Sequence, residues 1–219
     1  MPTASDLRND VQALVTLARR DVDSFWTRLS DADDARAVLQ AVMPTLVATY
    51  QSAAGTVAAD WYDDAREQAR QPGLYVPFVP EPDEAGAAEL ARWAIGPLFA
   101  PEPDWATARS KLDGGMQRRI ANVARQTVTT SAVDDPRSRG WQRVRLGDTC
   151  GFCIMLESRG AVYTEQTVDF AAHDNCDCQA VPAWDGQPKQ VRPYTPSVRS
   201  VSDADRARTR RWVADHNAG

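Results

Sequence analysis

All four cysteines of this chain lie within 29 residues, from Cys150 to Cys178, and one of only two histidines lies there too. Cys150 and Cys153 form a Cys-x-x-Cys pair, and nineteen residues later comes His173-Asp-Asn-Cys176-Asp-Cys178. A Cys-x-x-Cys turn directs two thiolates at one point, and a second pair from a returning loop completes the tetrahedron that Zn²⁺ accepts. The region around these cysteines has too few residues to form a hydrophobic core by itself. The pattern therefore predicts that a structural zinc ion holds this region together.

Five candidate ligands compete for the four positions of such a zinc site: Cys150, Cys153, His173, Cys176 and Cys178. The first pair is expected to bind, and the sequence does not decide which two of the other three join it. Four protein ligands leave no position for water, which disfavours a hydrolytic zinc. Two disulfides, unrelated buried thiols and a redox Cys-x-x-Cys are the alternatives. Four cysteines are too sparse for a disulfide scaffold, and the βαβ surroundings of a redox motif are missing.

Before residue 134 the apolar residues recur at helical spacing. A helix of about 25 residues is predicted after an N-cap at Ser5. A second helix is predicted after Asp31 or Asp33, kinked or restarted at Pro44, and continuing to about Arg70.

Beyond residue 70, prolines predict an extended connector to residue 82, followed by a short helix over 87–98. A long helix is predicted from Trp105 to about Ser131. Gly114-Gly115 lies inside this helix and costs it about 1 kcal/mol per glycine relative to alanine. Such a pair indicates close packing or a bend at that point.

Short strands are predicted on either side of the cysteines, at 141–146, 160–164 and 179–184. A proline-rich arm and a final short helix, from Ser202 or Asp203 through Trp212, follow them. The predicted fold class is mainly α: a long-helix bundle, then a small zinc-stapled α+β knuckle and an extended C-terminal arm. The expected organisation is a helical domain at 1–134, a zinc-knuckle region at 135–184, and an extended tail with a short helix at 185–219.

The net charge is −5, but its sign changes along the chain. Residues 1–104 carry 8 basic and 17 acidic groups, whereas residues 105–145 carry 9 basic and 3 acidic groups. The polar face of the long helix is predicted to carry Arg109, Lys111, Arg118, Arg119 and Arg125. Two interpretations stay open for these residues: a solvated helix surface, or a contact with nucleic acid or a protein partner. No membrane contact and no secretory signal are expected, because no apolar run reaches eighteen residues and a polar helix follows the N-terminus.

Several motifs together resemble the phage Mu F-like minor head proteins, particularly those of actinobacteriophages. They are the helical set Tyr50, Ala53, Ala54, Trp61, Tyr62 and Arg66, then Gly140-Trp-Gln-Arg-Val, Cys150-x-x-Cys153, Gly160-Ala-Val-Tyr163 and His173-x-x-Cys176-x-Cys178. The resemblance implies a minor capsid or head-morphogenesis protein, made in the bacterial host cytoplasm and carried in the virion at the portal or head interior. It implies portal and major capsid proteins as partners, and packaged DNA as a non-specific one.

No enzyme is expected, because the resemblance supplies no catalytic residues. The alternative of a capsid-maturation protease or zinc hydrolase would need a histidine beside a serine, and the chain offers only His173, which the metal claims, and His216 near the end. A third hypothesis, a zinc-finger regulator, lacks the helix-borne histidine pair of the common finger, and the overall charge is acidic.

Overall fold

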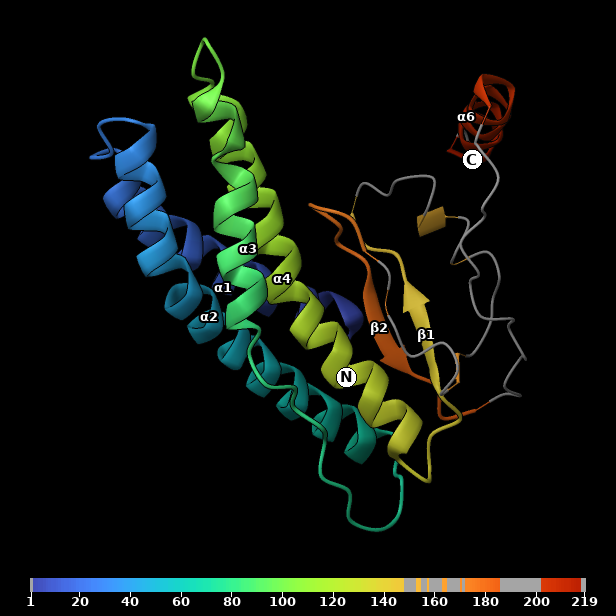
Figure 1. The fold of residues 1–219 in the computed structure, drawn as a ribbon. Coiled ribbons are helices and arrows are strands. Elements are labelled where there is room, and N and C mark those ends of the chain that lie inside the picture. The colour runs from blue at the N-terminus through green and yellow to red at the C-terminus, as the bar shows by residue number, and fades with distance from the viewer. Residues whose placement is uncertain are drawn as a thin grey trace.

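The computed structural model describes residues 2–147, 153–154, 157, 163–164, 170, 172–185 and 202–217 (Figure 1). Over these residues the chain is mainly helical, with one two-stranded sheet and a cluster of three cysteines that can hold a metal. The predicted fold class is confirmed to this extent. The expected ligand Cys150 and the expected arm at 186–200 lie outside the described residues.

The helical part contains α1 (Ala4–Trp26), α2 (Ala32–Gln68), α3 (Glu84–Ala94), the short 3-10 helix η1 (Gly96–Phe99) and α4 (Trp105–Asp134). The predicted first helix is confirmed, but its N-cap is Thr3 and not Ser5. The Thr3 hydroxyl accepts from the Asp6 backbone N–H at 3.2 Å, and the Asp6 carboxylate accepts from the Thr3 backbone N–H at 2.7 Å. This reciprocal pair satisfies two donors that the first turn would leave unpaired.

Helix α2 runs through Pro44 without ending there. A proline inside a helix removes one backbone hydrogen bond and costs about 3 kcal/mol. Leu39, Met43 and Val47, in the turns before and after it, are all completely buried. Burying such side chains contributes roughly 1.5–3 kcal/mol each, enough to keep the helix continuous across the proline.

Helix α4 is the central element of the fold, because α1, α2 and α3 contact it on one side and β2 on the other (Figure 1). The glycine pair inside it allows two close approaches. A Cβ on Gly115 would collide with the Leu90 side chain of α3, and one on Gly114 would come within 3.1 Å of Asp174 Cβ. The predicted close packing at Gly114-Gly115 is thus confirmed.

The sheet consists of β1 (Trp141–Val144) and β2 (Gln179–Pro182), which pair antiparallel with Trp141 opposite Pro182. Tyr163 forms an isolated bridge with Trp141, and their rings stack at 4.3 Å. This bridge is the described part of the strand predicted at 160–164. The two strands flank the segment that returns to the cysteines, so the sheet fixes where that segment begins and ends.

The final predicted helix is α6 (Asp203–Asn217), which continues past Trp212. Although α1, α2 and α4 are long enough to cross a bilayer, none of the helices within the described residues is also apolar enough to do so.

Candidate metal centre

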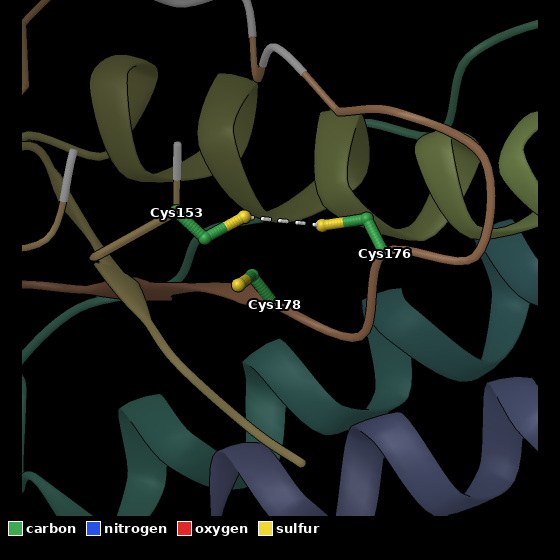
Figure 2. A group of neighbouring side chains, drawn as sticks. All are labelled: Cys153, Cys176 and Cys178. Carbon is green, nitrogen blue, oxygen red and sulfur yellow. Dashed lines mark hydrogen bonds between the residues drawn. The ribbon is translucent and has the colours of Figure 1, made fainter. Parts of the chain in front are cut away.

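Three cysteines from two separate segments meet beneath α4: Cys153 from the first pair, and Cys176 and Cys178 from the loop before β2. Their Sγ atoms lie within 4.8 Å of one another, and each residue is at most 2% exposed. Figure 2 shows Cys153 and Cys176 facing each other, with Cys178 beside them, and the first two sulfurs are 3.6 Å apart. All three are free thiols, so the disulfide alternative does not hold for the described cysteines.

The spacing of these sulfurs fits a tetrahedral metal. A Zn–S bond of about 2.3 Å places two sulfurs of one tetrahedron roughly 3.8 Å apart. The observed 3.6 Å between the Sγ atoms of Cys153 and Cys176 is close to that value. Because three soft ligands converge at a buried point, the cluster can hold Zn²⁺ with little rearrangement.

His173 lies at the edge of this cluster and its side chain is exposed. Its Nε2 is 4.0 Å from Cys153 Sγ, and its Nδ1 is 2.7 Å from the backbone carbonyl oxygen of Asp174. The structure therefore brings four of the five predicted ligands to one place, three inside the protein and one at its surface. The fifth, Cys150, is outside the described residues.

Two side chains of α4 hold the loop that carries Cys176 and Cys178. The amide of Gln117 donates to the Cys176 carbonyl at 3.2 Å and accepts from the Asn175 N–H at 2.9 Å. Arg125, which is 0% exposed, donates from Nε to the Cys178 carbonyl at 2.9 Å and from Nη2 to the Cys176 carbonyl. The loop therefore has its conformation set by the helix bundle as well as by the cysteines.

The outer side of the same loop is held by charged contacts. Asp177 accepts from Gln12 of α1 at 2.9 Å and pairs with Arg8 of α1 at 3.3 Å. Asp174 pairs with Arg118 of α4 at 3.2 Å. These contacts dock the loop against both the first and the fourth helix.

Two guanidinium groups face the sulfur cluster. Arg143 Nη1 is 4.0 Å from Cys153 Sγ, and the Phe170 ring lies 3.6 Å from the Arg143 guanidinium and 5.2 Å from that of Arg125. Within the described residues Arg125 forms no ion pair with a carboxylate, although a buried charge requires compensation. A cysteine sulfur can provide it as a thiolate, the state that a metal needs, and Arg125 favours that state in Cys176.

The pKa values of the three cysteines are shifted in different directions. Hydrogen bonds from Cys153 and Cys178 hold the pKa of the Cys176 thiol far below its usual range, and the positive charge of Arg125 acts in the same direction. Hydrogen bonding to Cys176 raises the pKa of Cys153, and the pKa of Cys178 is raised as well. Among the three cysteines, the surroundings therefore favour the thiolate form of Cys176.

The five basic residues predicted to contact nucleic acid or a partner do not form one open face. Arg109 pairs with Asp23 and Asp113, Lys111 lies over the Trp93 ring, Arg118 pairs with Asp174, Arg119 pairs with Asp83, and Arg125 is buried. The placement of Arg125 on the polar face is therefore wrong, because β2 and the cysteine loop cover that side of α4. Contact through the other four stays a prediction.

Sequence reasoning did not single out Gln117 and Arg143, although both support the cysteines. A signal was present for Gln117 and Arg125, which occur at helical spacing with Ala121 and Val128 in an otherwise apolar row. Nothing in the sequence marks Arg143, because its role depends on β1 passing beside Cys153.

Two curated relatives match more than half of the chain. The Gene 15 protein of Mycobacterium phage L5 is 28% identical over 134 residues, covering 57% of this chain and 43% of that protein. The Gene 15 protein of Mycobacterium phage D29 is 26% identical over 191 residues, covering 68% of this chain and 66% of that protein. The chain thus spans less than two thirds of either relative. No solved structure matches it significantly.

Both of these relatives are bacteriophage proteins, which supports a phage family for this chain. The family model described as VG15 protein matches residues 2–200, which include α1 to α4, the sheet and the cysteine cluster. The chain belongs to the VG15 protein family.

Proposed function

We propose that this protein is a structural minor capsid or head-morphogenesis protein of a tailed phage, of the Mu F-like type, and that it acts without catalysis. Family membership and the two phage relatives support a phage protein. The resemblance to Mu F-like minor head proteins supports the finer assignment. The observation that carries a binding role is an apolar strip on the surface, which a partner would cover.

This apolar strip is formed by Leu74, Val76, Phe78 and Val79, in the connector between α2 and α3. Leu74 is 103% exposed and Val76 is 85% exposed, while Phe78 and Val79 are about half as exposed at 41% and 42%. Contiguous exposed apolar side chains of this kind mark interaction sites.

The strip is held in place from beneath. The Tyr75 ring packs against Tyr62 with 5.9 Å between centroids, and the Phe78 N–H donates to the Ser131 hydroxyl at 2.9 Å. A fixed apolar strip binds a partner at a smaller entropic cost than a mobile one.

The portal protein is proposed to bind the apolar strip. The contacting surface of the portal protein would be apolar in the middle and basic at its rim. Glu67 precedes the strip and Glu81 follows it, and both are exposed, so basic groups would complement them. Packaged DNA is a second proposed partner. The exposed Arg210 and Arg211 of α6 suit it better than the arginines of α4, which are engaged within the chain. Arg206 and Arg208 of α6 are exposed too, but they pair with Asp203 and Asp205.

The zinc ion is proposed to be structural. Cys153, Cys176 and Cys178 would hold it, and Zn²⁺ would supply four-coordinate cross-linking of two chain segments. Arg125 and Gln117 would keep the loop in the binding conformation. A shell closed by four protein ligands has no position for a reactive water, which supports a structural zinc site over a hydrolytic one.

The test has two parts. Purified virions are digested and analysed by mass spectrometry, with this polypeptide expected at low copy number. A photo-crosslinking amino acid at Val76 is expected to attach to the portal protein, while the same group at Leu17, an exposed apolar residue of α1, is not. Absence of the polypeptide from particles would contradict the proposal, and attachment only to the major capsid protein would change the partner.

A further inference from the structure

We propose that the fourth metal ligand is the Nε2 atom of His173, so that the shell is Cys153, His173, Cys176 and Cys178. The inference rests on the structural zinc proposed above and assigns the position that the sequence leaves open. It makes Cys150 dispensable for binding.

The turn between His173 and Cys176 brings these two residues to the same side of the chain. The Cys176 N–H donates to the His173 carbonyl at 3.3 Å, and Asn175 adopts a left-handed conformation with φ 60°, which asparagine tolerates better than most residues. The Gln117 side chain accepts from the Asn175 N–H at 2.9 Å and thereby holds the turn. The His-x-x-Cys segment is thus preorganised in the manner of a Cys-x-x-Cys turn.

The imidazole is oriented for binding through Nε2. Its Nδ1 lies 2.7 Å from the Asp174 carbonyl oxygen, which only accepts, so Nδ1 carries the proton and donates it. The neutral ring then has its lone pair on Nε2. A backbone carbonyl that fixes the tautomer in this way is the usual outer partner of a metal-binding histidine.

The distance from Nε2 to the cluster is also suitable. Zn–S bonds of about 2.3 Å and Zn–N bonds of about 2.0–2.1 Å place a nitrogen and a sulfur of one tetrahedron roughly 3.6 Å apart. Nε2 is 4.0 Å from Cys153 Sγ, a few tenths of an ångström beyond that separation. His173 does not lie within 4.8 Å of all three sulfurs, so the imidazole would move toward the other two when the metal binds. His173 is exposed while the three cysteines are buried, so the metal would sit at the edge of the protein with the imidazole as its outer cover.

The charge of this shell matches its surroundings. Binding of Zn²⁺ would release the remaining thiol protons of the three cysteines to solvent, and the neutral imidazole contributes no charge. Three thiolates and one divalent cation leave a net charge of −1 beside the buried guanidinium of Arg125. Arg143 also faces the cluster, so this negative charge is shared between two guanidinium groups of opposite sign.

The test uses the full chain, loaded with Zn²⁺ for X-ray absorption and with Co²⁺ for optical spectroscopy. The expected first shell is three sulfur atoms and one nitrogen atom. Four sulfurs and no nitrogen would overturn the assignment of His173 while leaving the zinc clasp intact. Absence of bound metal from reduced wild-type protein would instead contradict the proposed function itself.

Three substitutions give matched comparisons. His173→Ala is expected to weaken Zn²⁺ binding by at least the roughly 10–100-fold that loss of an outer partner costs. His173→Cys is expected to restore binding with four sulfurs in the absorption spectrum. Cys150→Ser is expected to keep three sulfurs and one nitrogen with unchanged affinity. A larger loss of affinity in Cys150→Ser than in His173→Ala would contradict the proposal.

Discussion

The guanidinium of Arg125 donates to the backbone carbonyl of Cys178 across 2.9 Å, in the protein interior and 53 residues away in sequence. A second donor of the same side chain reaches the Cys176 carbonyl, and a third binds the Asn122 side chain at 2.9 Å. The central helix and the cysteine loop are therefore joined by a buried cation. The Arg125 side chain therefore contributes to the packing of both the helix bundle and the cysteine loop.

Arg125→Met is predicted to destabilise the zinc-loaded protein. The substitution leaves the carbonyls of Cys176 and Cys178 without their donor, at about 1–3 kcal/mol for each unsatisfied group, and it removes the charge that faces the thiolates. We expect a loss of roughly 3–5 kcal/mol in the free energy of unfolding, measured by urea titration.

Arg118→Met is the control for this substitution. Arg118 lies on the same helix and binds the same loop through Asp174, but its side chain is 40% exposed. A solvent-exposed ion pair contributes at most about 1 kcal/mol, so this variant should unfold close to the wild-type midpoint. Equal losses in the two variants would show that burial of Arg125 has no special role.

Removal of the proposed zinc ion is predicted to loosen the sheet more than the helices. The main apolar core is formed chiefly by α1 to α4, whereas β1 and β2 contribute few residues to it. In Cys176→Ser, or after chelation, amide hydrogen exchange should increase in β1, β2 and residues 172–178 and stay low in the buried turns of α2. Equally fast exchange in α2 would indicate that the chain unfolds as one unit.

The helices were predictable because their apolar residues recur at a regular spacing, but the environment of α4 was not. A helix packed on one side shows one apolar stripe, whereas α4 is covered by α1, α2 and α3 on one side and by β2 on the other. Gln117 and Arg125 lie in the buried rows and would be assigned to a polar surface by their residue type alone. Their polar groups are used for backbone contacts that only the tertiary structure creates.

The meeting of Cys153 with Cys176 and Cys178 was predictable because paired cysteine spacings on both sides of a returning loop are typical of ligands for one metal. The residues around them were not, since Gln12, Arg125 and Arg143 come from three separate elements. At Pro44 the local sequence predicts a kink or a new helix start, but α2 continues through it. The burial of Leu39, Met43 and Val47 outweighs the local effect of the proline. Residue spacing in the sequence predicts contacts within one segment, whereas contacts between segments depend on how the segments pack in the tertiary structure.

Stability is predicted to fall above pH 10 because of Tyr62. Burial raises the pKa of its phenol well above the usual value, and the negative charge of Asp135, 3.3 Å from the hydroxyl, raises it further. Below about pH 10 the phenol is protonated in both the folded and the unfolded chain. Above that pH the unfolded chain loses the proton first, so the free energy of unfolding decreases as pH rises. Urea titrations from pH 8 to 11 should show a shallower decline in Tyr62→Phe than in wild type, and parallel curves would contradict this assignment.

The paired substitution Leu74→Ser and Val76→Ser is predicted to impair assembly without loss of stability. Both side chains are almost fully exposed, so replacing them removes little buried apolar area and should shift the free energy of unfolding by no more than about 0.5 kcal/mol. A partner that covers them would lose roughly 25 cal/mol for each Å² of apolar area no longer buried, and incorporation into particles should decrease. Leu17→Ser, at an exposed apolar residue outside the strip, is the control and should assemble normally. Normal incorporation of the double variant, together with unchanged portal crosslinking from Phe78, would show that the strip is not the contact surface.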